Sequence, residues 1–317
     1  MRTWRTPQRT PLATYRWADW PRGWLTPSCR WYSGCCGAAS LPGWPTCCRG
    51  GRSTSVLHAL SHGPVTAPLL VACHGVTDSA ASLADFAARL AGRFHVVAVD
   101  SLSHGLSPRW DGAGDPLAAC LRALTATLAP LVATHGPAIL YGHSMGGALV
   151  SRLAAEHPHW VRGVIAEDPA WLTPEQEEHF AAWGPAEAAR LAAFDPQQAR
   201  AHLQQAYPTW PARDLPGWLA AKAQVDLALV RAGRVGYRAP WDSWGADLAV
   251  PTVFVTSDTP DCLLGPAGLA RLAATGNPHL RGELLPGARH CVRRENPEAF
   301  AACIEPYLAA WSRTDGS

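Results

Sequence analysis

A serine lies at the centre of the sequence GHSMG, residues 142–146. An apolar run precedes it over residues 138–141, and an apolar stretch with helical spacing follows it. This arrangement fits G-x-S-x-G, in which a sharp turn between a strand and a helix exposes the serine hydroxyl. Ser144 is therefore a candidate nucleophile, and the alternative is an ordinary serine at a helix N-cap.

The two glycines and the following backbone are the next candidates. In such a turn the residues two before and two after the serine approach closely, so Gly142 and Gly146 meet a steric requirement. The backbone N–H of Met145, at the start of the helix, can stabilise an oxyanion. We expect a second oxyanion N–H from Val76, which follows a predicted strand end at Gly75; a simple β-turn glycine is the alternative there.

A serine hydroxyl is a poor nucleophile near neutral pH and needs a base. Among thirteen histidines, His290 lies between the last predicted strand and the last predicted helix. It is the candidate base, and a solvated loop histidine is the alternative. His143 is adjacent to the serine, but we expect its side chain to point away, and His104 is expected to be structural.

Three aspartates could orient the imidazole of His290. Asp168 ends the predicted strand VRGVIAED, Asp258 directly follows the predicted strand PTVFVTS, and Asp261 comes three residues later. The geometry requires a carboxylate on a strand-end loop, constrained so that it accepts the imidazole N–H. All three aspartates meet the first of these conditions.

These candidates are embedded in alternating strands and helices that begin at about Ser53. The predicted strands are residues 54–62, 68–75, 95–100, 138–142, 161–168, 250–258 and 280–285. The predicted helices are residues 82–94, 116–132, 145–157, 266–274 and 297–311. Continuous apolar strands separated by helices predict an α/β fold, with a mostly parallel sheet and helices on both faces.

The alternation stops over residues 171–247, which are Ala-rich and helical without a strand pattern. This segment precedes the penultimate strand, at the sheet edge where ligands bind in open α/β folds, so it is predicted to be a helical lid. Its tryptophans favour an apolar substrate pocket. They are Trp171, Trp183, Trp210, Trp218, Trp241 and Trp244.

Residues from about Ser53 to Trp311 resemble the α/β-hydrolase fold superfamily. The resemblance rests on five stretches in the expected order. They are His74-Gly75, VVAVDSLSHGLS with Ser103 at the first glycine of D-x-x-G-H-G-x-S, GHSMGG, VPTVFVTSD and PGARHCVRRENPEAF. The order serine, acid, histidine also matches this superfamily.

The resemblance implies an order of preference among the acids. In the family an aspartate usually lies a few residues past the penultimate strand, before an apolar pair and a helix-starting proline. DCLLGP reproduces this from Asp261, so we expect Asp261 first, then Asp258, then Asp168. A serine at position 144 argues against epoxide hydrolases and haloalkane dehalogenases, which use an aspartate nucleophile.

The predicted function is hydrolysis of a small to medium apolar ester, or a related carbonyl compound, through an acyl-enzyme. No cofactor or metal is expected. The alternatives are a hydrolase-like binding protein with little or no turnover, a cofactor-free perhydrolase and a C–C bond hydrolase. A chromogenic ester panel and an active-site probe distinguish these possibilities.

Charge and composition set further expectations. The formal net charge of +2 favours neither a nucleic-acid nor a membrane partner, and the oligomeric state is left open. Residues 1–52 hold eight arginines and one acid and lack periodicity, so they are expected to be a disordered extension, with a wrongly assigned start as one origin. A cationic arm that binds membrane or nucleic acid is the alternative.

Cysteine and lysine usage complete the sequence-based expectations. The ten cysteines include no C-x-x-C pair, and the N-terminus lacks the apolar core of a secretory signal, so a cytoplasmic location is expected. The chain has one lysine, Lys222, against twenty-six arginines. An excess of arginine over lysine of this size usually reflects the nucleotide composition of the gene.

Overall fold

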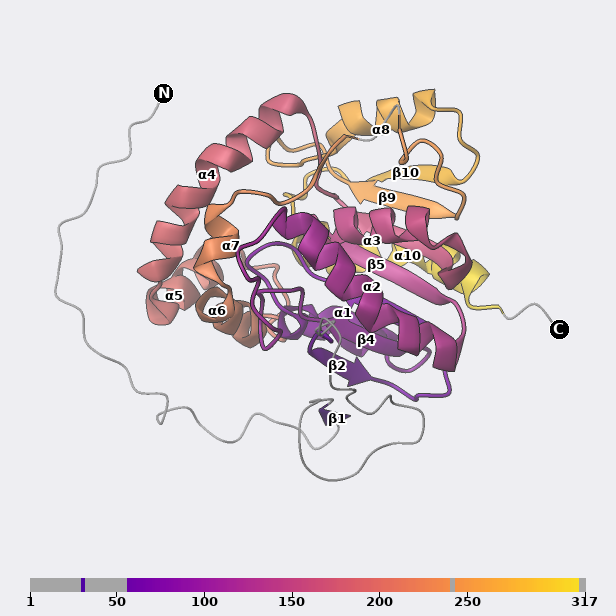
Figure 1. Ribbon diagram of the computed structural model, residues 1–317, viewed down its shortest axis with the longest axis horizontal. Helices are drawn as coiled ribbons and strands as arrows, with labels where there is room; N and C mark the ends of the chain where they lie inside the picture. The colour runs from indigo at the N-terminus through magenta and orange to yellow at the C-terminus, as the bar shows by residue number, and fades with distance from the viewer. Residues whose placement is uncertain (1–29, 32–55, 240–242, 314–317) are drawn as a thin grey trace.

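The computed structural model describes residues 30–31, 56–239 and 243–313. Its central feature is an eight-stranded sheet in the order β1-β2-β4-β3-β5-β6-β9-β10 (Figure 1). The strands are β1 (Arg30–Trp31), β2 (Ala59–His62), β3 (Leu69–Cys73), β4 (His95–Val99), β5 (Ala138–His143), β6 (Val161–Glu167), β9 (Thr252–Thr256) and β10 (Leu280–Leu284).

Six neighbouring strands, from β4 to β10, run parallel, whereas β2 is antiparallel to β4 and β1 is antiparallel to β2. The prediction of a mostly parallel sheet with helices on both faces is confirmed. The predicted extension over residues 1–52 lies outside the described residues except for β1, which pairs Arg30 with Ser61 and Trp31 with Leu60.

Helices cover both faces of the sheet. They are α1 (Ala84–Leu90), α2 (Pro116–His135), α3 (Met145–Glu156), α8 (Gly265–Ala274), α9 (Val292–Glu295) and α10 (Pro297–Trp311), with short 3₁₀ turns η2 (Ala80–Leu83) and η3 (Pro158–Trp160). Helices α2, α3 and α8 pack into one core, and α1 and α10 into the other. In Figure 1, α2 and α3 lie in front of the sheet and α10 behind it.

Strand β3 shows why this sheet needs helices on both sides. Leu69, Val71 and Cys73 are buried in one core, while Leu70 and Ala72 are buried in the other. A strand with apolar residues at every position is typical of a parallel sheet that is covered on both faces. The sequence pattern at residues 68–75 therefore predicted the environment of this strand as well as its position.

Helix α2 is the one helix among the described residues that is both long and apolar enough to cross a membrane. An 18-residue stretch within its 20 residues has a mean hydropathy of 1.6, a criterion of length and composition alone. In the structure, however, its leucine face packs into the core through Leu117, Leu121, Leu124 and Leu128. Asp115 caps its first turn by accepting a hydrogen bond from the Ala118 N–H at 2.8 Å.

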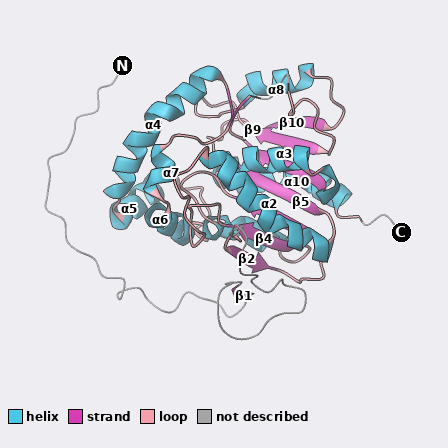
Figure 2. Cartoon of the chain, in the orientation of Figure 1, coloured by secondary structure: helices cyan, strands magenta, loops and turns pink. Residues whose placement is uncertain are grey.

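A helical segment separates β6 from β9. It contains α4 (Pro174–Ala192), α5 (Pro196–Ala206), α6 (Leu215–Gln224) and α7 (Leu227–Arg231). Figure 2 shows these helices beside the end of the sheet toward which the parallel strands point. We call residues 173–236 the helical insertion.

Two short strands lie at the two ends of the helical insertion, where the sequence predicted no strand. Strands β7 (Trp171–Leu172) and β8 (Tyr237–Arg238) pair in parallel and close the segment. Two-residue strands are too short to produce a detectable alternation. Trp171 is 1% exposed and packs against Phe254 and Trp244, so it is a core residue. Trp241 lies outside the described residues.

Candidate active site

Ser144 occupies the junction between β5 and α3 with φ 53° and ψ −118°. This left-handed backbone is strained for a residue with a side chain, and it is held by hydrogen bonds on both sides. The Ser144 N–H donates to the Glu167 carbonyl at 3.0 Å, and the Ser144 carbonyl accepts from the Ala170 N–H at 3.0 Å. Among the described residues the hydroxyl has no hydrogen-bond partner, so it is available to a substrate.

The glycines flanking Ser144 are sterically required. A Cβ on Gly142 would lie 2.4 Å from the carbonyl oxygen of Gly146, and a Cβ on Gly146 would lie 2.4 Å from that of Cys73. The chain can therefore turn from strand to helix here only because both positions lack a side chain. The backbone matches the turn that the G-x-S-x-G pattern predicts.

The imidazole of His290 is paired with Asp168, which directly follows β6. The distance from Nδ1 to Oδ2 is 2.5 Å. The same carboxylate accepts from the Thr256 hydroxyl at 2.6 Å and from the backbone N–H groups of Leu263 and Leu264 at 2.8 and 3.0 Å. Asp168 is fully buried, whereas the His290 side chain is 30% exposed.

This environment keeps Asp168 ionised. Burial by itself raises the pKa of the carboxyl group, but the hydrogen bonds from His290, Thr256 and the Leu263 N–H outweigh it and lower the pKa below its usual value. A buried anion on Nδ1 fixes the ring and leaves Nε2 as the nitrogen that can accept a proton. The pair therefore has the arrangement of a general base with its orienting acid.

The structure corrects the order of preference among the three candidate acids. Asp261, the first choice, is exposed and accepts from the Thr259 hydroxyl at 2.6 Å. Its only contact with His290 is a 3.4 Å hydrogen bond from the backbone N–H. Asp258 is also exposed, and it accepts from the Gly287 N–H at 2.8 Å. Neither reaches the imidazole.

Strand order explains why Asp168, and not Asp258 or Asp261, pairs with His290. In the sheet β6 lies next to β5, the strand that ends at the candidate nucleophile, while β9 lies one strand further away. A residue that directly follows β6 therefore starts beside the turn of Ser144. Asp168 also adopts φ 35°, which no sequence pattern reveals.

The two backbone groups proposed for an oxyanion lie on adjoining segments. A Cβ on Gly75 would lie 3.3 Å from the Ser144 Cβ, so the turn after β3 touches the candidate nucleophile. Within the described part of the chain, neither the Val76 N–H nor the Met145 N–H has a hydrogen-bond acceptor. Both donors are therefore available to a developing negative charge.

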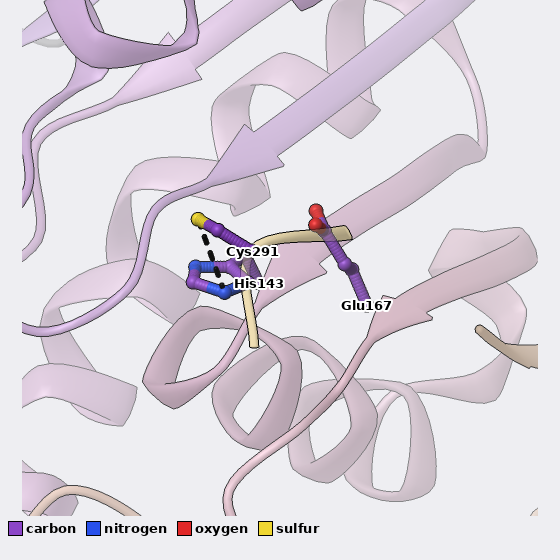
Figure 3. Close-up of side chains that lie close together, drawn as sticks. All are labelled: His143, Glu167 and Cys291. Carbon is purple, nitrogen blue, oxygen red and sulfur yellow. Dashed lines mark hydrogen bonds between the residues drawn. The ribbon is translucent and has the colours of Figure 1, made fainter. Parts of the chain in front are cut away.

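His143 lies beside Cys291, the residue that follows His290 (Figure 3). Its Nε2 is 3.2 Å from the His290 carbonyl and 3.7 Å from the Cys291 Sγ, and the two imidazole rings are 4.7 Å apart. The ring thus contacts the backbone and side chains of residues 290–291 and supports that loop. Burial lowers the pKa of His143, so the ring is neutral and donates through Nε2.

His143, Glu167 and Cys291 place donor atoms within 4.8 Å of one another, a spacing that could suit a metal ion. The Glu167 carboxylate, however, already accepts from the Tyr141 hydroxyl and, at 2.8 Å, from the Arg293 N–H. Burial raises the pKa of the Cys291 thiol, which keeps it protonated. These donors therefore fit a hydrogen-bonded support for the loop better than a cation site.

His104 is structural, as predicted: it is fully buried, and its Nδ1 is 2.9 Å from the Leu102 carbonyl. No sequence pattern predicted the group of buried charges around residues 75–78, which we call the Val76 turn. The members of this group are Asp78, Asp214, Lys222, Arg293 and Arg294, each at most 5% exposed. Only Lys222 carried a sequence signal, as the sole lysine, and that signal was attributed to gene composition.

Comparison with known proteins gives a consistent picture. A family model described as the alpha/beta hydrolase family matches residues 70–303. A 2-(acetamidomethylene)succinate hydrolase of Mesorhizobium japonicum is 30% identical over 258 residues, which cover 77% of this chain and 88% of that protein. The lipase LipV of Mycobacterium tuberculosis is 30% identical over 207 residues, covering 62% of this chain and 74% of the lipase.

Solved structures agree at the level of the fold. The crystal structure of E-2-(acetamidomethylene)succinate hydrolase superposes with a TM-score of 0.63 at 25% identity, covering 80% of this chain and 95% of that one. A thermophilic esterase from Thermogutta terrifontis gives a TM-score of 0.62 at 20% identity, covering 81% of this chain and 95% of the esterase.

Proposed function

The chain belongs to the alpha/beta hydrolase family and is an enzyme of that family, and from this premise we propose that it is a serine hydrolase of carboxylic esters. The observation that carries the proposal is the strained Ser144 on its glycine-flanked turn, in a chain that also pairs His290 with the buried Asp168. A nucleophile, a base and an orienting acid are the parts that acyl transfer needs.

The proposed reaction has two halves. Ser144 Oγ attacks the carbonyl carbon while its proton passes to His290 Nε2, and Asp168 stabilises the imidazolium through Nδ1–H. The N–H groups of Val76 and Met145 hold the oxyanion. The leaving alcohol takes the proton from His290, and a water molecule activated by the same imidazole then releases the acid from Ser144.

The hydrogen bond between Ser144 and His290 forms in the substrate complex under this proposal. Among the described residues, no hydrogen bond joins the Ser144 hydroxyl to the imidazole. In enzymes of this kind such contacts often tighten only when substrate is bound. The 30% exposure of the His290 side chain leaves room for the movement.

The charges around the site support a substrate without carboxylate groups. The relative from Mesorhizobium japonicum is named for a succinate, which carries two carboxylates. Here the cations beside the Val76 turn and the His290 loop already have carboxylate partners. The pairs are Lys222 with Asp78, Arg289 with Glu295, Arg293 with Asp214, and Arg294 with Asp78 and Asp214.

Two measurements test the proposal. Purified protein is offered p-nitrophenyl esters from acetate to palmitate and is separately treated with a fluorophosphonate probe. We expect ester turnover and labelling, and we expect Ser144→Ala or His290→Ala to lower kcat by roughly 10³ or more. Ser312→Ala, which changes a serine beyond the end of α10, serves as the control.

Near-normal turnover in Ser144→Ala or His290→Ala would contradict the proposed mechanism. A protein that neither hydrolyses any ester nor reacts with the probe would instead support the alternative of a hydrolase-like binding protein. Labelling without ester turnover would direct the search to other carbonyl substrates.

A further inference from the structure

We propose that Lys222, the only lysine of the chain, is a positioning residue that holds the Val76 turn so that the Val76 N–H faces the oxyanion. The inference rests on the proposed function, because it assigns a task to that same site. The inference goes beyond the proposed function because it makes one side chain of the helical insertion responsible for the geometry of the oxyanion donor.

The Val76 turn, residues 75–78, needs to be held in place. Its ends are joined by a hydrogen bond from the Asp78 N–H to the Gly75 carbonyl at 3.2 Å, which leaves Val76 and Thr77 at the two central positions. Thr77 has φ 63°, a left-handed conformation that is unfavourable for a β-branched residue. A strained residue keeps such a conformation only when its surroundings impose it.

Lys222 supplies that constraint from α6. Its Nζ donates hydrogen bonds to both the carbonyl oxygen and the hydroxyl of Thr77, each at 2.8 Å. The ammonium group also lies 3.6 Å from the Asp78 carboxylate and 4.4 Å from the centre of the Trp218 ring. The Thr77 carbonyl belongs to the peptide group between Thr77 and Asp78, so the two bonds fix the conformation of the residue that directly follows Val76.

Helix α6 is docked firmly enough to serve as an anchor. Gly217 packs so closely on η2 that a Cβ there would lie 2.1 Å from the Ala81 carbonyl oxygen. Asp214, which precedes α6, accepts a hydrogen bond from the Asp85 N–H at 2.8 Å. Because α6 is held in this way, Lys222 has a fixed position relative to the Val76 turn.

The helix that follows His290 holds the same turn from another side. Arg294 donates to the Asp78 carboxylate at 3.0 Å and to the Ser82 carbonyl at 2.9 Å. Asp214 pairs with both Arg293 and Arg294. Arg294 anchors Asp78, but Lys222 alone among these cations binds Thr77, so its loss should affect the Val76 N–H most directly.

The test compares Lys222→Met with Gln224→Met, which introduces the same side chain two residues further along α6. We expect Lys222→Met to lower kcat about 10- to 100-fold with KM changed less than about twofold, because a displaced oxyanion donor weakens only the transition state. Affinity for a trifluoromethyl ketone, whose tetrahedral adduct places an oxyanion there, should fall by the same factor as kcat/KM. Gln224→Met should match wild type.

A second variant removes one of the two contacts. Thr77→Val keeps the β-branched shape and the carbonyl acceptor but lacks the hydroxyl, so we expect a smaller fall in kcat. Combined with Lys222→Met it should add little further loss, because both changes act on one interaction. Losses that multiply would overturn the proposal, as would an unchanged kcat or a rise in KM alone for Lys222→Met.

Hydrogen–deuterium exchange separates this inference from the proposed function. In Lys222→Met the amides of residues 74–83 should exchange faster than in wild type, whether or not the protein hydrolyses esters. Unchanged exchange there would overturn the role of Lys222. Absence of Ser144-dependent chemistry in wild type would overturn the proposed function instead, and the exchange result would still decide whether Lys222 holds the turn.

Discussion

Asp168 receives four hydrogen bonds, from His290, Thr256, Leu263 and Leu264. Full burial would disfavour its charge, but these donors reverse the effect and lower the pKa of the carboxyl group. Three of the donors belong to the protein scaffold and one to His290, the proposed base. Asp168 therefore cannot swing away from the imidazole, which is what an orienting acid requires.

At this residue scale, the acid is tested by three single substitutions. Asp168→Asn should keep the fold but leave the imidazole in the wrong tautomer, lowering kcat by up to about 10⁴. Asp258→Asn and Asp261→Asn are the matched controls, and we expect each to change kcat less than about threefold. The measurement is kcat for the best ester substrate. An active Asp168→Asn beside an inactive Asp261→Asn would reverse the assignment.

At the scale of elements, α6 and η2 form the contact on which the Val76 turn depends. The approach is close because Gly217 faces the backbone of Ala81 with no side chain between them. Trp218, the next residue, covers the ammonium group of Lys222. One glycine thus sets the distance between the helical insertion and η2, the 3₁₀ turn that follows the proposed oxyanion donor.

Gly217→Ala tests this contact. The added methyl group would overlap the Ala81 carbonyl oxygen, so α6 must shift outward, at a cost of about 1–3 kcal/mol in the free energy of unfolding. We expect kcat to fall as well, because Lys222 moves with the helix. Thermal unfolding and ester kinetics are compared with Gly92→Ala, an exposed position where an added Cβ has nothing within 4 Å. Equal stability of the two variants would contradict the expectation.

At the scale of the whole molecule, the charges beneath the active site are balanced. Three cations and three anions are buried together: Lys222, Arg293, Arg294, Asp78, Asp214 and Glu167. Burying charges is unfavourable unless each is paired, and here each cation has at least one carboxylate within 4 Å. The network joins the helical insertion, the Val76 turn and the His290 loop.

Lys222 links this network to pH. Burial is the main cause that lowers its pKa from 10.5 to about 8. Nearby charges partly cancel, since Asp78 and Glu187 raise the pKa while Arg294 and Arg190 lower it. Between about pH 8 and 10.5 the unfolded chain therefore holds a proton that the folded protein has released, so the free energy of unfolding rises with pH over this window.

The difference between the two pKa values corresponds to about 3 kcal/mol. We expect wild type to gain up to about that much stability relative to Lys222→Met between pH 8 and 10.5, because the variant lacks the titrating group. Urea unfolding of both proteins at about pH 7.5, 9 and 10.5 measures the change. A stability difference that stays constant over this range would contradict the lowered pKa.

The sequence by itself determined the fold class and indicated Ser144 and His290 as the candidate nucleophile and base. Period and composition located the strands and helices because apolar runs and helical spacing are local properties. The glycines around Ser144 predicted a sharp turn from strand to helix, because only residues without side chains fit there. The position of His290 followed from the order of the elements.

Only the tertiary structure decided which aspartate pairs with His290 and which side chain holds the Val76 turn. Asp168 follows β6, and Asp258 and Asp261 lie on the loop after β9, so all three are near strand ends. The choice among them depends on strand order and on donors far along the chain, at Leu263 and Thr256. Lys222 meets Thr77 across 145 positions of sequence. Such contacts leave no periodic or local trace, because they form only where the folded chain brings distant segments together.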